Sequence, residues 1–375
     1  MPAILITLCL LLVAASLSLS RKGSAEGKLI ETKNGQIKVE TVARGLDRPW
    51  AFAFLPDGRM LVTEKRGRLR IVAQDGTISK PVAGVPEVIA NGQGGLLDVA
   101  LDPAFAANGL VYLAYSEAGE GGAGTAVARG TLGDGRLENA EVIFQQKPKV
   151  SGGNHFGSRL AFSPDGKLFV TLGDRFKFDP AQDLASDLGK VVRINPDGSI
   201  PSDNPFVGQE GKLPEIWSYG HRNPQGAAIH PVTGKLWEAE FGPFGGDELN
   251  IPEAGKNYGW PVVSWGKHYD GTDIPDPPEH PEFADAVYHW NPVISPSGIA
   301  FYTADLLPGW KDNLILSGLS SESITRLELD GEKVVGEERI ELGSRIRDVA
   351  QGPDGALYAL TDAGNGRILK LTPAR

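Results

Sequence analysis

Short apolar runs separated by turn residues recur along the chain, and the clearest pair lies near its middle. The runs at residues 160–162 and 168–172 flank a Pro-Asp-Gly turn at 164–166. Because Asp-Gly is a strong turn pair between strands, this segment predicts a tight β-hairpin. Folding about that turn brings Asp174 to the same rim as His155. A histidine and a carboxylate at an open strand end can form an oriented general base; the alternative is a polar loop residue beside a turn cap.

The same pattern, an apolar strand, a turn and a second apolar strand, occurs six times. Successive turns are roughly 45 to 75 residues apart, the scale of a four-stranded propeller blade with insertions. The sequence therefore predicts an all-β fold, a six-bladed β-propeller with four-stranded antiparallel blades, because radial repetition protects strand edges. A strand near residues 37–42 is expected to complete the last blade, and a pair of β-sandwiches is the alternative. The other five units begin near residues 51, 97, 226, 298 and 348.

The N-terminus carries a different signal. An apolar run over residues 4–19 is followed by Ser-Arg-Lys at 20–22. The run is shorter than the ~20 residues of a spanning helix, so residues 1–26 are predicted to be a secretory signal segment that is cleaved; an uncleaved anchor is the alternative. Cleavage removes Cys9, the only cysteine, which excludes disulfides. Residues 27–375 are then expected to form one periplasmic or secreted propeller domain without a membrane span.

Charge and composition limit the classes of molecule that the protein is expected to bind. The 375 residues carry a formal net charge of −10 at pH 7, and no run of Lys or Arg interrupts them. Binding to nucleic acid is therefore not expected. The 48 glycines and 27 prolines are spread along the chain, which suits many turns between short strands.

Polar loops precede the first strand of most units. In a propeller, equivalent positions of each repeat lie on one rim around the axis, so these loops are expected to form one pocket. Several arginines at one mouth of an acidic protein indicate an anionic ligand that carries carboxylates, although each arginine alone could equally form a surface ion pair. The residues expected to converge are Gln93, His155, Arg222, Asn223, Arg345 and Arg347.

Five motifs follow one another in these loops. They are Asn91-Gly-Gln-Gly-Gly-Leu-Leu-Asp, Gly153-Asn-His-Phe-Gly-Ser-Arg, Gly220-His-Arg-Asn-Pro-Gln-Gly, Gly242-Pro-Phe-Gly-Gly-Asp-Glu-Leu-Asn and Arg345-Ile-Arg-Asp. Together they resemble the soluble glucose/sorbosone dehydrogenase family, in particular the bacterial aldose sugar dehydrogenases that use pyrroloquinoline quinone (PQQ). The resemblance covers about residues 37–373 and keeps the family order of motifs, and it independently implies a six-bladed propeller.

The resemblance also implies an activity, the oxidation of aldose sugars at the anomeric carbon to lactones. PQQ and calcium are implied at the axis mouth, with a dye, quinone or cytochrome as electron acceptor. His155 is implied as the general base that takes the anomeric hydroxyl proton while hydride moves to the quinone, Asp174 as its partner, and Arg222 as a cation against the quinone oxygens. Cofactor contacts are implied for Gln93, Arg222, Asn223, Tyr269, Ser320, Arg345 and Arg347.

Two calcium sites follow from the same resemblance. The family uses the carbonyls of a Gly-Pro pair, here Gly242 and Pro243, and carbonyl oxygens suit a hard cation. A second site is implied at Glu248 and Tyr258; the alternative for Glu248 is a strand-end carboxylate without a metal. The remaining histidines show no metal-ligand spacing and are expected to be structural or exposed, namely His221, His230, His268, His280 and His289.

Three positions depart from the family pattern. Phe241 and Phe244 replace polar or basic residues, and Ser320 stands where many relatives carry a lysine. These changes support an alternative, a propeller that has lost catalysis and binds a sugar or a partner protein. A lactonase-type hydrolase that uses calcium to activate water is a third reading, which the arginines and amides of the rim disfavour.

Overall fold

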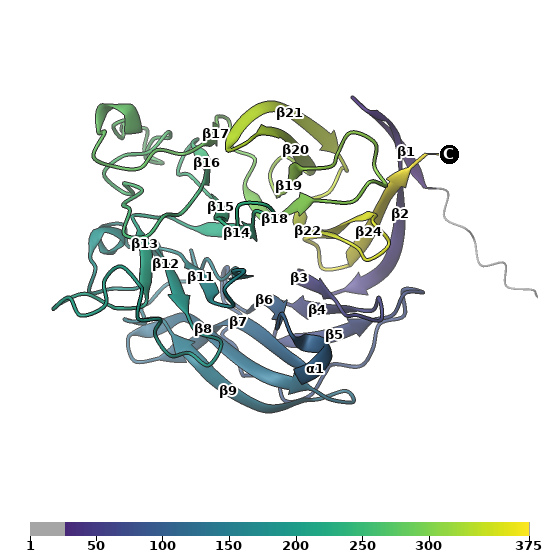
Figure 1. Cartoon of the computed structure of the whole chain (residues 1–375), viewed down its shortest axis with the longest axis horizontal. Helices are drawn as coiled ribbons and strands as arrows, with labels where there is room; N and C mark the ends of the chain where they lie inside the picture. Colours follow the sequence, from purple (N-terminus) through teal and green to yellow (C-terminus); the bar gives the residue numbers. More distant parts are fainter. Residues whose placement is uncertain (1–26, 375) are drawn as a thin grey trace, which may run out of the picture.

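The computed structural model describes residues 27–374, and their strands form six antiparallel sheets arranged in a ring. Figure 1 views the ring with the inner strands around its centre. The first sheet holds β3 (Pro49–Phe54), β4 (Met60–Glu64) and β5 (Arg68–Val72), and the second β6 (Leu96–Leu101), β7 (Leu110–Gly119), β8 (Gly122–Leu132) and β9 (Leu137–Gln145). The third holds β10 (Leu160–Phe162), β11 (Leu168–Leu172), β12 (Lys190–Ile194) and β13 (Ile216–Tyr219), and the fourth β14 (Pro224–Ile229), β15 (Leu236–Glu240), β16 (Asp247–Asn250) and β17 (Tyr288–Trp290).

The last two sheets complete the ring. The fifth holds β18 (Pro296–Tyr302), β19 (Asn313–Gly318), β20 (Ser323–Asp330) and β21 (Lys333–Glu341). The sixth holds β22 (Ile346–Gln351), β23 (Leu357–Thr361) and β24 (Gly366–Pro373), joined by β1 (Lys28–Thr32) and β2 (Gly35–Leu46) from the other end of the chain. Between strands lie a short helix, α1 (Phe105–Asn108), and two 3₁₀ turns, η1 (Asp179–Gln182) and η2 (Pro277–Glu279).

The ring confirms the predicted propeller and excludes two sandwiches. Strand β2 pairs antiparallel with β24, from Ile37 opposite Pro373 to Leu46 opposite Gly366, so the N-terminal strand closes the last blade as expected. Blade size is less regular than predicted, because the first sheet has three strands and the sixth has five. After β5 the chain pairs with that strand only irregularly, through a bridge from Ile78 to Val72 and single hydrogen bonds from Ser79 and Val82, and prolines in this loop remove N–H groups that a regular fourth strand needs.

The predicted hairpin is present with its expected register. Leu160 pairs with Val170, and Phe162 pairs with Leu168. Every residue of β11 is buried, and its apolar side chains pack against Tyr112 and Val127 of the second sheet. The core thus lies between facing sheets. The inner strands β3, β6, β10, β14, β18 and β22 contact their neighbours around the ring, which gathers the loops that precede them at one mouth.

One buried arginine joins most of the inner strands. Arg159, directly before β10, lies 3.0 Å from Asp98 Oδ1 and 3.1 Å from Asp348 Oδ1 through its two terminal nitrogens. Its Nε donates to the carbonyl of Gln225 at 2.6 Å, and its guanidinium lies 4.3 Å from the ring centroid of Trp50. These partners belong to β6, β22, β14 and β3. The side chain therefore contacts four of the six sheets, and its backbone leads into the strand of a fifth.

Glycine makes room for this network on the remaining sheet. A Cβ built on Gly298 of β18 lies 1.7 Å from Asp348 Oδ1, so any other residue there collides with the carboxylate. Burial raises the pKa of Asp348 to about 6, and burial also raises the pKa of Asp98; the charge of Arg159 opposes both shifts. The two carboxylates consequently depend on the arginine for their charge balance.

No helix in residues 27–374 is long and apolar enough to cross a membrane. The predicted signal segment, residues 1–26, lies outside the described residues.

Replacing Arg159 with Met tests the axial network. We expect a loss of about 3–5 kcal/mol of unfolding free energy, because two buried carboxylates lose their cation. Burial raises the pKa values of Asp98 and Asp348 in the folded state, so the folded protein binds more protons than the unfolded chain. At pH 5 protonation neutralises more of the unpaired carboxylate charge, so the loss of stability should be smaller at pH 5 than at pH 8. Denaturant unfolding at both values measures it. Arg59→Met, in an exposed turn, is the control; equal effects of the two changes contradict this role of Arg159.

Candidate active site

His155 and Asp174 meet at the mouth of the ring. Nδ1 of His155 lies 2.7 Å from Oδ1 of Asp174, and both side chains are buried. His155 stands in the loop before β10 and Asp174 two residues after β11, so the hairpin brings the two residues together as its turn predicted. Oδ1 of Asp174 also accepts the backbone N–H of Phe176 at 2.8 Å. The pair is held in one geometry by the sheet beneath it.

The loops around this pair carry unusual backbone conformations. His155 has a φ of +51°, and Arg175 and Phe176 have φ values of +55° and +59°. Positive φ costs energy for residues with side chains, and such strain clusters at functional sites. The Gln93 side chain compensates in part, because its Oε1 accepts the N–H of His155 at 2.8 Å. Gln93 thus positions the histidine backbone, a role that the resemblance did not assign to it.

The electrostatic surroundings keep the imidazole neutral. Burial lowers the pKa of His155 below its ordinary value of 6.5; the hydrogen bond with Asp174 opposes this shift, and the charges of Arg222 and Arg175 add to it. The carboxylate holds the proton of the neutral ring on Nδ1. Nε2 is then free to accept a proton at neutral pH, which is the state a general base requires.

Arg222 lies beside this pair. The backbone N–H of Asp174 donates to the carbonyl of Arg222 at 2.8 Å. The guanidinium donates through Nη1 to the carbonyl of Gly242 at 2.7 Å and through Nη2 to the hydroxyl of Tyr269 at 3.1 Å. Its Nε is buried and has no hydrogen-bond partner within the described residues. The structure therefore brings the predicted Arg222 and Tyr269 together, with one donor still available.

A cationic cavity of about 340 Å³ lies at the axis. Three predicted cofactor residues, Gln93, Arg345 and Arg347, line it. Asp362 pairs with both arginines, at 3.2 Å and 2.9 Å. Arg347 also donates to Gln225 at 2.8 Å, while its Nε has no partner in the described part of the chain. Burial lowers the pKa of Arg347 and the charge of Asp362 opposes this, so the site concentrates positive charge that one carboxylate balances only in part.

Two further cations line the same cavity and were not predicted as cofactor residues. Arg48 comes from the loop before β3, and Lys65 directly follows β4. Burial lowers the pKa of Lys65, and the charges of Arg347 and Arg48 contribute to the shift. Arg48 could have been predicted from the sequence, because it belongs to one of the polar loops before a first strand. Lys65 could not, because it lies at a strand end that the motifs do not cover. Lys65 supplies a further cation to the cavity that Leu319, the neighbour of Ser320, also lines.

Asn223 and Ser320 occupy different places from the arginines. Asn223 is buried, and its Oδ1 accepts the N–H of Gly157 at 3.2 Å, which ties it to the histidine loop. Ser320 is exposed, and its hydroxyl donates to the carbonyl of Val293 at 3.4 Å. Leu319, its neighbour, lines the cavity. Asn223 thus acts on the site through the loop, and Ser320 lies beside the cavity.

The Gly242-Pro243 pair borders a larger groove of about 1080 Å³, which Phe244 and Tyr269 also line. The exposed fraction of Phe244 is 67% and that of Tyr269 is 63%, so this groove opens to solvent over aromatic rings. Asp247 fixes the loop, because its Oδ1 accepts the N–H of Gly242 at 2.9 Å. Phe241 lines both the groove and the axial cavity.

The residues of the second predicted metal site lie next to a buried acidic cluster. A small cavity of about 10 Å³, the size of a single small ion or water, is lined by Glu240, Glu248 and Tyr258. The Tyr258 hydroxyl already donates to the carbonyl of Ile251, which leaves the Tyr258 carbonyl as its available oxygen. Burial, followed by the charge of Glu240, raises the pKa of Glu248 well above its ordinary value.

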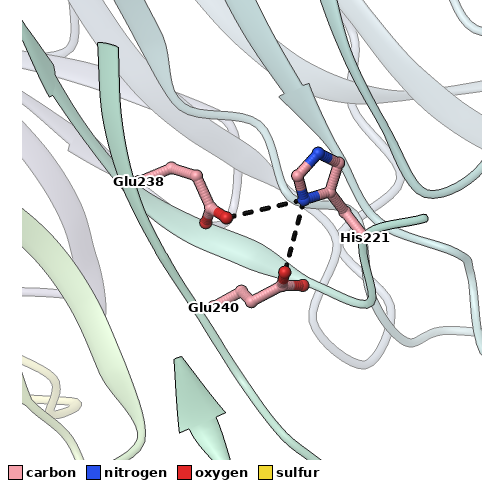
Figure 2. Close-up of side chains that lie close together, drawn as sticks. All are labelled: His221, Glu238 and Glu240. Atoms are coloured by element: carbon pink, nitrogen blue, oxygen red, sulfur yellow. Dashed lines mark hydrogen bonds and ion pairs between the residues drawn. The ribbon is translucent and has the colours of Figure 1, made fainter. Parts of the chain in front are cut away.

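His221 belongs to this cluster, as Figure 2 shows. Its Nδ1 lies 3.3 Å from Glu240 and 3.5 Å from Glu238, and all three side chains are buried. Burial opposes protonation of His221, yet the two glutamates outweigh it and raise its pKa to about 9. The Tyr258 ring stacks on the imidazole at 4.8 Å. His221 shows no metal-ligand spacing in the sequence, but the structure brings it together with Glu238 and Glu240, with ligand atoms within 4.8 Å of one another, and its cation balances only part of the glutamate charge.

The fold and the site define the class: a propeller enzyme with an acid–base pair and a cationic cavity at its axis. Residues 46–370 match the glucose/sorbosone dehydrogenase family. The chain belongs to that family, which confirms the resemblance and the prediction of an oxidoreductase of this class. It is 46% identical over 350 residues to aldose sugar dehydrogenase YliI of Escherichia coli K12, covering 90% of this chain and 93% of that protein.

Solved structures agree. The soluble aldose sugar dehydrogenase of Escherichia coli in its apo-form superposes with a TM-score of 0.87 at 45% identity, and the match covers 90% of this chain and 100% of that one. The PQQ-bound form of an aldose sugar dehydrogenase from Streptomyces coelicolor superposes with a TM-score of 0.74 at 31% identity, covering 90% of this chain and 97% of that one.

The His155 ring tests the electrostatic account. We expect it to titrate below 6.5 in the apo-protein, and Asp174→Asn to lower the midpoint further, because the neutral amide no longer stabilises the imidazolium. The His155 ring then has a higher pKa in the unfolded chain than in the folded protein. As the pH falls below about 6.5, the unfolded chain binds the additional proton first, so protonation of His155 favours unfolding. NMR of the ring nitrogens measures the midpoint, with His155→Gln to assign the resonance. A midpoint above 6.5, or a rise in Asp174→Asn, contradicts the account.

Proposed function

We propose that the protein oxidises aldose sugars at the anomeric carbon to lactones with PQQ and calcium, in the periplasm or outside the cell. The observation that carries the proposal is the His155–Asp174 pair beside a cavity lined by cations. Support comes from the relatives, which include an aldose sugar dehydrogenase with PQQ bound. The natural electron acceptor is a dye-like, quinone or cytochrome partner.

The residues of the cavity fit PQQ. The cofactor is a quinone with three carboxylates, and arginines and lysines bind carboxylates well. Arg222 and Arg347 each keep one buried Nε without a partner in the described residues, which is the kind of donor that a bound acceptor satisfies. In this proposal the residues that line the axial cavity hold the cofactor directly, namely Gln93, Arg48, Lys65, Arg345 and Arg347. Tyr269, which lines the neighbouring groove, and its hydrogen-bond partner Arg222 contact the cofactor from that side, Asn223 supports the His155 loop, and Ser320 lies beside the cavity.

The two calcium sites fit hard oxygen donors. Gly242 and Pro243 offer carbonyls at the groove, and the Gly242 carbonyl, which already accepts from Arg222, keeps a second lone pair. Glu248 and the Tyr258 carbonyl offer the second site, with Glu240 as a further ligand. Nearby, Glu238 Oε2 and Asn250 Oδ1 have no hydrogen-bond partner in residues 27–374. The buried Glu238 and Glu240 face one imidazolium, with the partly buried Glu248 beside them, so negative charge is in excess and a divalent cation would balance it.

The chain's own residues manage the proton. A sugar in the groove presents its anomeric hydroxyl to Nε2 of His155, which accepts the proton while Asp174 stabilises the imidazolium through Nδ1. PQQ, when bound, supplies the two-electron acceptor for hydrogen from the anomeric carbon. Arg222 places fixed positive charge beside that position, in a site from which burial has removed water. Phe176, whose ring meets His155 edge-on at 5.2 Å, covers one side of the imidazole.

Reconstitution tests the activity. Apo-protein is expected to bind PQQ in the presence of Ca²⁺ and then to reduce a dye with glucose or other aldoses. His155→Ala should lower kcat by about 10²- to 10⁴-fold and retain PQQ binding, because only the base is lost. The control is His280→Ala, at a surface ion pair with Glu282. A wild-type protein that neither binds PQQ nor reduces dye contradicts the proposal and favours a binding propeller, and a fully active His155→Ala removes the proposed base.

Calcium binding has its own test. Ca²⁺ should stabilise the wild-type protein and so raise its thermal midpoint. At a hundredfold excess of Ca²⁺ over its Kd, the unfolding free energy should rise by about 2.7 kcal/mol. Glu248→Gln should raise the stability of the metal-free protein, because one buried carboxylate charge disappears, and should reduce the calcium effect. Glu253→Gln, at an exposed position, is the control. If Glu248→Gln and the wild type respond equally to Ca²⁺ and to a chelator, Glu248 is not a ligand.

A further inference from the structure

Trp260 reaches the acid–base pair from a distant part of the chain. It lies in the long connection between β16 and β17, and its ring is 4% exposed. Its indole Nε1 donates to Oδ2 of Asp174 at 2.8 Å. The other oxygen of that carboxylate accepts from His155 Nδ1 and from the N–H of Phe176. Both carboxylate oxygens of Asp174 therefore have donors, and Trp260 is the one that comes from outside the third sheet and its loops.

The same ring also lies against Arg222. The guanidinium carbon is 5.1 Å from the Trp260 ring centroid, within the range of a cation–π interaction. The backbone N–H of Trp260 donates to the carbonyl of Gly220 at 2.9 Å, two residues before Arg222. Phe178 packs on the outer side of the indole at 5.6 Å. These contacts fix the ring on three sides, so its N–H has a defined direction.

We infer that Trp260 is a positioning residue that fixes the Asp174 carboxylate and the Arg222 guanidinium relative to each other through one buried indole. The inference deepens the proposed function, because it concerns the base and the cation of the same site. An indole N–H donor stabilises the ionised carboxylate and holds its plane toward His155. Without that donor, Oδ2 is a buried carboxylate oxygen that has lost a hydrogen bond, and the carboxylate holds protons more tightly.

The consequence for His155 has a definite sign. The charged groups that face His155 are Asp174, Arg222 and Arg175. Removing the indole N–H makes Asp174 a stronger acceptor for the proton on Nδ1, so the imidazolium becomes easier to form. The His155 midpoint should therefore rise, and the acidic limb of the activity profile should move to higher pH. Loss of the ring contact should also loosen Arg222, which affects cofactor binding.

Trp260→Phe is the direct test, because phenylalanine keeps a ring against Arg222 and removes only the donor. We expect the His155 midpoint, measured by NMR in the apo-protein, to rise by about half a unit to one unit. After reconstitution with PQQ and Ca²⁺, we expect kcat to fall about tenfold, with KM changed little. The matched control is Trp217→Phe, which removes an indole donor that bonds to the Pro252 carbonyl at 3.0 Å. An unchanged midpoint and unchanged kcat overturn the inference.

Two readouts keep this test independent of folding and of the proposed function. The apo-protein titration does not need PQQ, so a wild-type protein that fails to oxidise aldoses contradicts the proposed function and leaves the positioning role to the NMR result. In the wild type, the Trp260 indole proton resonance is expected to shift with the same midpoint as His155. An indole resonance that stays constant through that titration overturns the inference even if Trp260→Phe does not fold.

Discussion

The ion pairs of Arg159 with Asp98 and Asp348 are the constraint on which the mouth of the ring depends. Each sheet could pack against its neighbours through apolar side chains alone, and that packing fixes no common position for the inner strands. The buried guanidinium of Arg159 fixes such a position for the inner strands, because its planar donors hold the two carboxylates in set directions. Burial makes the network costly to break, since each partner left alone is an unpaired charge. The loops before the inner strands therefore meet around one axis.

That convergence produces an electrostatic contrast. The chain is acidic, with a net charge of −10, yet its axial cavity gathers Arg48, Lys65, Arg345 and Arg347 around the carboxylate of Asp362. Arg48 and Arg345 come from the loops before β3 and β22, Lys65 follows β4 and Arg347 lies in β22, so only the ring brings these cations together. On the neighbouring side, burial and two arginines hold His155 neutral while Asp174 orients it. A cationic cavity next to a neutral, oriented base suits the quinone-dependent oxidation that we propose.

Much of this could be predicted from sequence because it depends on local signals. The Pro-Asp-Gly turn set the hairpin register, and that register alone placed His155 near Asp174. Repetition of the unit predicted the ring and its closure by the N-terminal strand. The uneven blade sizes were missed, because a missing strand after β5 depends on prolines in a loop, and the extra strand β1 depends on pairing with β2 at the edge of the last blade.

The parts that escaped prediction depend on contacts far apart in sequence. Trp260 touches Asp174 across 86 residues, from a loop outside the repeats. The acidic cluster arises because Glu238 and Glu240, two residues apart on β15, point to the same face of the sheet, where His221 from the preceding loop meets them. Ligand spacing along one segment could not reveal that group. The role of Gln93 as a hydrogen-bond partner of the His155 backbone likewise needs the assembled ring.

The most direct test of the account is the crystal structure of the protein reconstituted with PQQ and Ca²⁺. The account predicts cofactor density at the axial cavity that Arg345 and Arg347 line, with its carboxylates on the arginines, and with the bond between His155 and Asp174 intact and Nε2 of His155 free to accept a proton. Cofactor bound elsewhere, or a His155 ring turned away from Asp174 in the loaded protein, would contradict it.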